Sequence, residues 1–325
     1  MTKIKCLTLT VITESQVALS NDQGTGGNYT PVKKMFYKDG VHLFASVSTF
    51  TYELRRILKE EFGWKLFDIQ VKSKNIVNRQ IENESEEADL FGYLLPDKQV
   101  NRLSPLRVIP PISINRYHSD TQLITNRGFL NRDLGREYYD EKGGKTDNVP
   151  TTQAFASEEI MGDNYQYTIT VELERIGRNE IKRDGEKVEV LTPSQYSYKD
   201  SKIRKKIVID LLEAIKIFTR KIKHQTVFLE PQAVFGGLFS QVVPYFANSI
   251  LFKNNILHLD NIKQTIDNYS LGNGSLLIKA ANSRININPV EEFAIENNPV
   301  GELNKLINFI NETIVINENN EWIIE

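Results

Sequence analysis

The order of sequence patterns along the chain predicts an α+β fold with a ferredoxin-like core. An alternating strand pattern near the start is followed by an amphipathic helix, and a second clean alternating pattern in the middle is followed by another long amphipathic helix. A less regular strand pattern lies between the first helix and the second alternating pattern, and further strand patterns follow the second helix. The order is therefore strand, helix, strand, strand, helix, strand. In such a core, two helices cover one face of a sheet and leave the other face open.

The first strand is expected from Ile4 to Thr13. Apolar residues at positions 7, 9 and 11 alternate with Thr8 and Thr10, which is typical of a strand with one buried face. A loop with three glycines, from Asn21 to Lys34, follows, and a short apolar segment leads to the first helix.

That helix is expected from Ser46 to Gly63, "SVSTFTYELRRILKEEFG". Apolar residues recur at helical spacing, Ser46 or Ser48 can cap the start, and Gly63 suits a left-handed end. Tyr52, Arg55 and Lys59 line a second face, from which Arg56 points away.

The middle of the chain is irregular. An acidic loop is expected near 81–89, and the segment 106–114 contains Pro110 and Pro111, which exclude a central strand but fit an edge. The alternation over 165–173 predicts a regular strand. We therefore expect a single elaborated domain over 1–325 with large insertions between 64 and 160.

Three further elements complete the expected order. A charged hairpin within 177–200 turns at Asp184-Gly185, a helix runs from Lys202 to Lys223, and a last helix runs from about Val300 to Ile314.

Composition narrows the class of protein. The chain has 325 residues, 40% of them hydrophobic, one cysteine (Cys6), and no run of 18 apolar residues. Its polar start does not resemble a signal peptide, so a cytoplasmic protein without a disulfide framework or membrane span is expected.

Charge is distributed unevenly, although the net charge is only −2. The segment 99–136 contains six arginines. The segment 201–223 contains eight basic residues and two acidic ones, whereas 291–325 contains eight glutamates and one lysine. Each run alone is typical of a solvated face. Together they also fit a protein that binds a polyanion and associates with its own copies.

Catalytic signatures are missing from the sequence. His42, His118, His224 and His258 have no metal-ligand spacing, and neither a phosphate-binding loop nor a nucleophile motif is present. We expect no cofactor, no metal and no enzymatic activity.

Several phrases together resemble a known family. "SQVALSNDQGTGGN", "SVSTFTYELRRIL", "DLFGYL", "RLSPLRVIPPISI", "DTQLITNRGF" and "YQYTITVELERIG" follow one another as in the DevR-type CRISPR-associated family, with a weaker match in "AVFGGLF". This family supplies the repeated backbone subunit, Cas-seven, of type I-B Cascade complexes. The resemblance covers about residues 5–178.

The resemblance implies a fold and a function. Members of this RAMP superfamily have an RRM-like palm with inserted fingers and a thumb, which here would fall within 64–160. They polymerise along a CRISPR guide RNA, hold its phosphates without reading its sequence, and support its pairing with target DNA. The implied partners are the guide RNA, the target DNA strand, further copies, Cas-five, the large subunit and the guide-processing endonuclease.

The resemblance also indicates residues for RNA contact. The positions are Asn21, Lys33, Lys34, Ser46, Ser48, Thr49, Arg55, Arg102, Arg107, Arg127, Phe235, Gly236 and Gly237. A helix N-terminus can receive a phosphate, and a glycine loop lets RNA approach the backbone. The alternatives are an ordinary helix cap, a surface loop, structural ion pairs for the arginines and a core position for Phe235.

Two other functions stay open from the sequence. Type III relatives cut target RNA with a loop aspartate, and Asp22 lies in the comparable loop, although a lone aspartate is usually a turn residue. A transcriptional autoregulator, as the family's older name suggests, would need to bind duplex DNA, but no helix-turn-helix signature is present. The stretch before the 165–173 strand also lacks a histidine that many relatives have.

Overall fold

The structure is a computed structural model. It describes residues 2–20, 29–37, 40–72, 75–80, 85–95, 100–118, 120–125, 138–139, 142–146, 155–184, 187–222 and 225–325. Asn21, Asp22 and Arg127 lie outside these residues.

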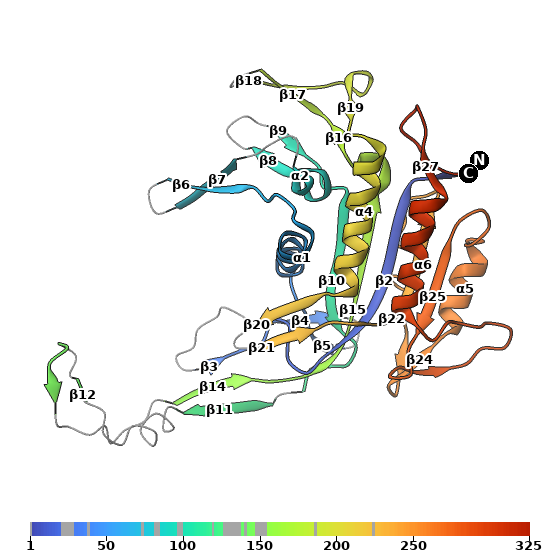
Figure 1. Cartoon of the computed structure of the whole chain (residues 1–325). Coiled ribbons are helices and arrows are strands. Elements are labelled where there is room, and N and C mark those ends of the chain that lie inside the picture. The colour runs from blue at the N-terminus through green and yellow to red at the C-terminus, as the bar shows by residue number, and fades with distance from the viewer. Residues whose placement is uncertain are drawn as a thin grey trace.

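A five-stranded antiparallel sheet forms the centre of the molecule (Figure 1). Its strands, in spatial order, are β10 (Leu106–Ser113), β15 (Asp163–Glu172), β2 (Cys6–Ser15), β22 (Pro231–Phe239) and β25 (Leu277–Ala281). The regular strand expected at 165–173 is confirmed as β15, which pairs with β2 over ten residues.

Three helices lie against one face of this sheet: α1 (Val47–Phe62), α4 (Ser201–Lys216) and α6 (Pro299–Glu312) (Figure 1). Along the chain, α1 separates β2 from β10, and α4 separates β15 from β22. The expected order of strand, helix, strand, strand, helix, strand is therefore present. The α+β prediction is confirmed.

The main core lies between these helices and the sheet. Leu9 of β2 and Leu211 of α4 are fully buried in it, and the ring of Phe50 lies 4.8 Å from that of Tyr167 and 4.7 Å from that of Phe218. Burial of each such side chain stabilises the fold by roughly 1.5–3 kcal/mol.

The second face of the sheet is not open, and that expectation was wrong. A second apolar cluster, which includes Phe235 and Phe246, lies on this side, and residues 240–298 supply much of it. Thr8 and Thr10 are also buried, and their hydroxyls pair with those of Thr170 at 3.0 Å and Thr168 at 2.8 Å. Polar residues on a strand can thus be buried when a neighbouring strand supplies hydrogen-bond partners.

The strand β10 lies at the edge of the sheet, as its prolines predict. Its pairing with β15 shifts register between Ile109 and Ile112, around Pro110 and Pro111. The carbonyl of Pro111 accepts a hydrogen bond from the Ala45 N–H at 2.9 Å, which ties this edge to the start of α1.

The helix expected over 202–223 is shorter than predicted. It ends at Lys216, and Thr219–Ile222 (β20) pairs with Gln225–Phe228 (β21) as a hairpin. The stretch from Ile217 to Ile222 contains three β-branched residues and an aromatic one, and Phe218 is drawn into the core beside Phe50. Tertiary packing and β-propensity here outweigh the continued helical spacing of Phe218 and Ile222.

Part of the expected acidic loop is a short helix, α2 (Glu86–Phe91). Ser85 caps it by accepting the Ala88 N–H at 3.1 Å, and Gly92 ends it. Acidic residues in a first helical turn are stabilised by the helix dipole. The loop prediction was therefore wrong for residues 86–89.

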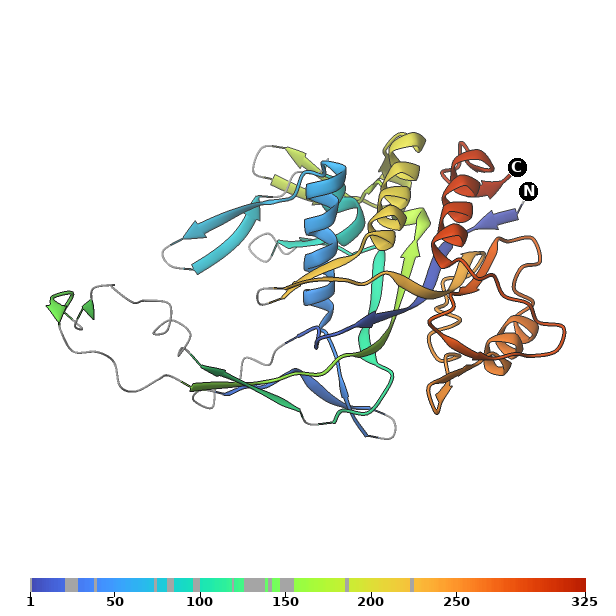
Figure 2. The same ribbon diagram turned by 60° about the horizontal axis from the view of Figure 1, so that its bottom comes forward.

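Several ribbons project from the body. β6 (Asp68–Lys72) pairs with β7 (Asn75–Gln80), and β14 (Phe155–Glu159) pairs with β11 (Thr121–Thr125) and β3 (Tyr29–Thr30). Figures 1 and 2 show both ribbons extending from the same side of the molecule. β17 (Ile181–Asp184) and β18 (Lys187–Val190) form the hairpin expected near Asp184.

The remaining elements are short. They are β1 (Thr2–Ile4), β4 (Lys34–Tyr37), β5 (Gly40–Leu43), β8 (Tyr93–Leu95), β9 (Val100–Arg102), β12 (Tyr138–Tyr139), β13 (Lys145–Thr146), β16 (Arg178–Asn179), β19 (Ser197–Tyr198), β23 (Phe252–Lys253), β24 (Ile256–His258), α5 (Asp260–Asn268), β26 (Asn286–Asn288), β27 (Ile314–Ile316) and β28 (Trp322–Ile324). Among the described residues, none of the helices has both the length and the apolar character that a membrane crossing requires.

Candidate nucleic-acid interface

The N-terminus of α1 is capped and accessible. Ser46 accepts the Thr49 N–H at 3.2 Å, and the two side-chain hydroxyls lie 3.0 Å apart. Val47 and Ser48 are exposed, and the first turn contains no acidic residue. The cap satisfies one of the free N–H groups, while the positive end of the helix dipole still faces solvent. This end can receive an anion such as a phosphate.

Lys33 lies beside this helix start. Its carbonyl accepts the Phe44 N–H at 3.2 Å, and its ammonium is 5.4 Å from the centre of the Phe44 ring. Since Phe44 precedes the Ser46 cap by two residues, the structure brings Lys33 and the helix N-terminus together. The sequence offered both as RNA contacts but did not place them side by side.

An exposed stripe continues along α1 from Ser48. Tyr52 and Lys59 lie four and eleven residues after Ser48, which places them on the same face of the helix, and the Tyr52 side chain is 62% exposed. An exposed aromatic ring near cations can stack with an unpaired base, since every base presents a π-face.

Lys34 has a different environment from Lys33. Its ammonium is 2.7 Å from Glu159 and lies over the Tyr117 ring at 4.5 Å. Glu159 also accepts hydrogen bonds from the Tyr29 hydroxyl and the Val32 N–H. Burial would raise the pKa of Glu159, but hydrogen bonds from Lys34, Tyr29, Val32 and Tyr117 together lower it to about 2. These contacts fix the base of the β11–β14 ribbon, so Lys34 has a structural role.

Arg55 is held by the fold. Its Nε donates to Glu87 at 2.7 Å, its guanidinium lies 3.9 Å from the centre of the Phe91 ring, and Glu87 is buried. Arg55 thus joins α1 to α2, which favours the alternative of a structural ion pair. Its contact with RNA stays a prediction.

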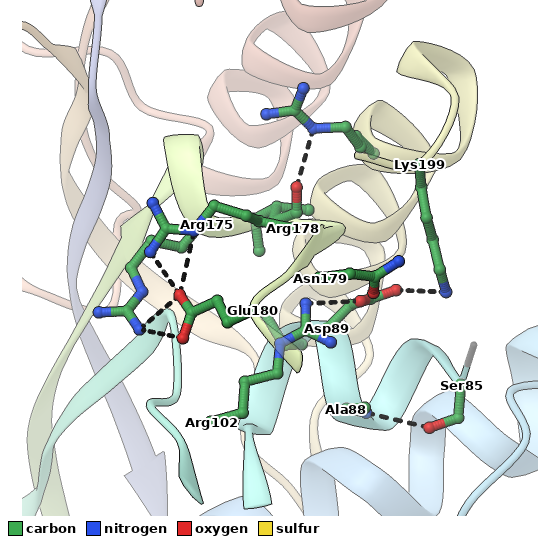
Figure 3. A network of polar contacts seen from close by, with 12 residues as sticks. Ser85, Ala88, Asp89, Arg102, Arg175, Arg178, Asn179, Glu180 and Lys199 are labelled. Atoms are coloured by element: carbon green, nitrogen blue, oxygen red, sulfur yellow. Dashed lines mark hydrogen bonds and ion pairs between the residues drawn. The ribbon is translucent and has the colours of Figure 1, made fainter. Parts of the chain in front are cut away.

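Arg102 is buried in a network that Figure 3 shows. Its guanidinium donates to Asp89 at 2.7 Å, and Lys199 reaches the other oxygen of Asp89 at 2.6 Å. A buried carboxylate needs such partners to remain ionised. Arg102 therefore joins β9 to α2, and Lys199 joins α2 to the segment that leads into α4.

The same network continues toward α4. Glu180 accepts hydrogen bonds from Arg175 and Arg178 at 3.0 Å each (Figure 3). Arg204 of α4 donates to the Ile176 carbonyl at 2.8 Å, and burial lowers its pKa to about 10.

Arg107 and the glycine pair lie away from the α1 end. Arg107 is half exposed on β10, with its Nε 3.3 Å from Glu172. Phe235, Gly236 and Gly237 are in the interior strand β22 and not in a loop, which corrects the expectation drawn from the resemblance. Phe235 is a core residue, as the alternative held.

The glycines of β22 are explained by strand packing. A Cβ atom on Gly236 would lie 2.0 Å from the Thr8 carbonyl oxygen, and one on Gly237 would lie 1.9 Å from that of Leu276. Both contacts are far shorter than van der Waals distance, so neighbouring backbone excludes any side chain here.

The β20–β21 hairpin occupies residues for which the sequence predicts a continued helix. Its Thr219 accepts a hydrogen bond from Arg56 at 2.8 Å, and Arg220 pairs with Glu53 of α1 at 2.6 Å, so the hairpin lies on α1. Lys221 is 56% exposed and only 3.4 Å from Glu60. The β-branched residues between 217 and 222 were the available signal for this strand.

Among the described residues, no three histidine, cysteine or acidic side chains are grouped to hold a metal.

The fold is that of proteins in CRISPR surveillance complexes. One similar structure, titled "CRISPR RNA-guided surveillance complex", has a TM-score of 0.53 at 11% identity and covers 93% of this chain and 98% of that chain. Another, titled "CRISPR RNA-guided surveillance complex, pre-nicking", has a TM-score of 0.56 at 9% identity, and the alignment covers 94% of this chain and 100% of that chain.

The family follows from the sequence itself. The model of the family described as "CRISPR-associated negative auto-regulator DevR/Csa2" matches residues 7–254, and the chain belongs to this family. The resemblance seen in the sequence motifs is thereby confirmed. No curated protein matches the chain.

Proposed function

We propose that this chain is the Cas-seven backbone subunit of a type I-B Cascade complex, of which several copies line up along one guide RNA. The family match over residues 7–254 carries this proposal. The similar structures support it, because the alignment covers 98% and 100% of their chains and is not confined to one domain. The five-stranded sheet with α1 and α4 corresponds to the RRM-like palm of the RAMP superfamily, and the projecting ribbons correspond to fingers and thumb.

The guide RNA would lie along the exposed side of α1. Ser48 and the free helix end receive one phosphate, Lys33 and Lys221 supply charge, and Tyr52 stacks with a base. These contacts involve phosphates and ring faces, so they hold any guide sequence.

The complex forms without cleavage by this subunit, in the cytoplasm, and includes the target DNA strand, Cas-five, the large subunit and the guide-processing endonuclease. Co-expression with those subunits and a CRISPR transcript tests this. A protein that co-purifies with RNA of defined ends is expected; a monomer free of nucleic acid under these conditions would contradict the proposal.

Two alternatives give different results in the same preparation. A type III-like ribonuclease would cut complementary RNA at regular intervals with magnesium, and Asp22→Ala would abolish the cuts. The family's description, a negative auto-regulator, suggests the other alternative. That function requires sequence-specific binding of duplex DNA, which a gel-shift assay with the promoter of its own operon measures.

A further inference from the structure

One face of α5 presents a row of side-chain amides. Asn261, Gln264 and Asn268 follow at positions i, i+3 and i+7, so they lie on the same side of the helix. Within the described part of the chain, none of these amides has a hydrogen-bond partner. Each amide offers both donor and acceptor groups, so the row can bind a partner that also carries both.

The amides line one side of a surface trough of about 500 Å³. On its other side, Val243 and Pro244 are exposed, and the rings of Tyr245 and Tyr269 lie 5.2 Å apart. None of the described residues that line the trough is charged. Because Lys and Arg are missing from the lining, phosphates would find no counter-charge in it.

A second hollow, which we call the socket, adjoins the trough. Asn248 lines both the trough and this hollow of about 300 Å³, whose wall has an apolar part with Ile109, Ile112, Ile250 and Phe252 and a polar part with His42, Ser113 and Gln166. The apolar part suits a single apolar side chain, as the central pockets of protein interfaces do.

We propose that the trough and socket bind an extended, uncharged segment of another protein subunit. The main chain of that segment pairs with the amides of α5, and one apolar side chain enters the socket. A peptide group matches a side-chain amide in donors and acceptors, whereas a nucleic acid would also bring phosphates into a neutral trough.

The location fits this role. Figures 1 and 2 show α5 on the side of the sheet opposite to the projecting ribbons. The helix also lies beyond residue 254, where the family match ends. This inference rests on the proposed function, because it requires a chain that works within a complex of several proteins.

The test uses the complete complex, assembled on guide RNA. Asn268 is replaced by the photo-crosslinker p-benzoylphenylalanine, and in a matched control Lys263, on another face of α5, is replaced instead. We expect position 268 to cross-link to one defined segment of another protein subunit, identified by mass spectrometry. Cross-links to RNA or DNA, or no protein cross-link above that of position 263, would overturn the inference.

A second measurement separates binding from proximity. Gln264→Lys with Asn268→Lys places two charges in the neutral trough and should weaken association with the cross-linked subunit at least tenfold. Lys263→Ala with Asp267→Ala removes an exposed ion pair at 3.4 Å on the same helix and should change nothing. Equal association by both variants would contradict the inference. Failure of the wild-type chain to assemble with RNA would instead contradict the proposed function.

Discussion

All three described arginines that the sequence offers as RNA contacts are paired with carboxylates. Arg55 is bound to Glu87, and Arg102 to Asp89, and both carboxylates are buried. Such an arginine can bind a phosphate only if it breaks its ion pair with a buried carboxylate, which is unfavourable. Among the described residues, neither Lys33 nor Ser48 is paired with a carboxylate, so both are better placed for RNA.

Removal of Arg55 should therefore affect stability more than RNA binding. Arg55→Ala is expected to lower the free energy of unfolding by roughly 2 kcal/mol, since the pair is only partly exposed and the buried Glu87 would lose its ion-pair partner while keeping the hydrogen bond from the Phe67 N–H. Arg55→Ala with Glu87→Gln should recover much of that loss. Urea denaturation measures both variants. If Arg55→Ala is as stable as the wild type and binds guide RNA more weakly, Arg55 contacts phosphate after all.

The lowered pKa of Glu159 predicts that the stability of the fold depends on pH. Its pKa in the folded protein is lowered to about 2 from an ordinary value of 4.5, so its contribution to stability is present above pH 4.5 and is lost as the pH falls toward 2. Glu159→Gln removes this titration. The stability of the wild type should fall more steeply than that of Glu159→Gln between these pH values in thermal unfolding. Parallel curves would show that Glu159 is not ionised with a lowered pKa.

Residue-scale contacts could be predicted only where they are local. Ser46 and Gly63 cap α1 as the sequence indicates, because a cap depends on residues within one helical turn. The partners of Arg55 and Arg56 include residues 32 and 163 positions away, Glu87 and Thr219. No pattern in the sequence relates positions so distant.

At the scale of elements, periodicity predicted the long regular ones. The strand β15 and the helices α1 and α6 were found within two residues of their ends, because each has a clear period and end signals. The early end of α4 and the short helix α2 were missed, since competing packing or capping decides the state of a few residues at a time. The helix α5, between β24 and β25, was not anticipated at all.

The β20–β21 hairpin gives an element-scale prediction. Lys221→Ala should weaken guide binding for unrelated guide sequences alike, because a phosphate contact carries no base information. The slope of log affinity against log salt should become shallower by about 0.7. Fluorescence anisotropy with two guides at several salt concentrations measures this. Lys206→Ala, an exposed lysine on α4, is the control; an equal loss in both variants would indicate only a general effect of charge.

At the scale of the whole molecule, the charge separation of the sequence is partly compensated within the fold. The basic helix α4 packs against α6, where the Lys205 ammonium reaches the Asn311 carbonyl at 3.2 Å. In the basic region Arg220 pairs with Glu53 at 2.6 Å, and in the acidic region Glu321 pairs with Lys3 at 2.9 Å. Only the exposed remainder of each charged region can act between copies.

Deletion of the acidic end cannot test assembly cleanly. In α6, Leu303, Leu306 and Ile310 are fully buried in the main core, and β28 pairs with β1. Removal of residues from Pro299 onward should therefore abolish cooperative unfolding in a thermal melt, because the core is exposed. A truncated chain that still unfolds cooperatively would show that α6 is peripheral.

Charge reversal on a second, exposed acidic loop, residues 291–296, tests assembly without disturbing the core. Glu291, Glu292 and Glu296 are exposed, so their replacement by lysine should leave the fold unchanged. If opposite charges meet between neighbouring copies, the variant should form shorter assemblies on guide RNA at low salt, and added salt should shorten those of the wild type. Light scattering after size exclusion measures the length, with Glu61→Lys on α1 as the control. If the variant assembles to wild-type length at low salt, the acidic loop is only a solvated surface.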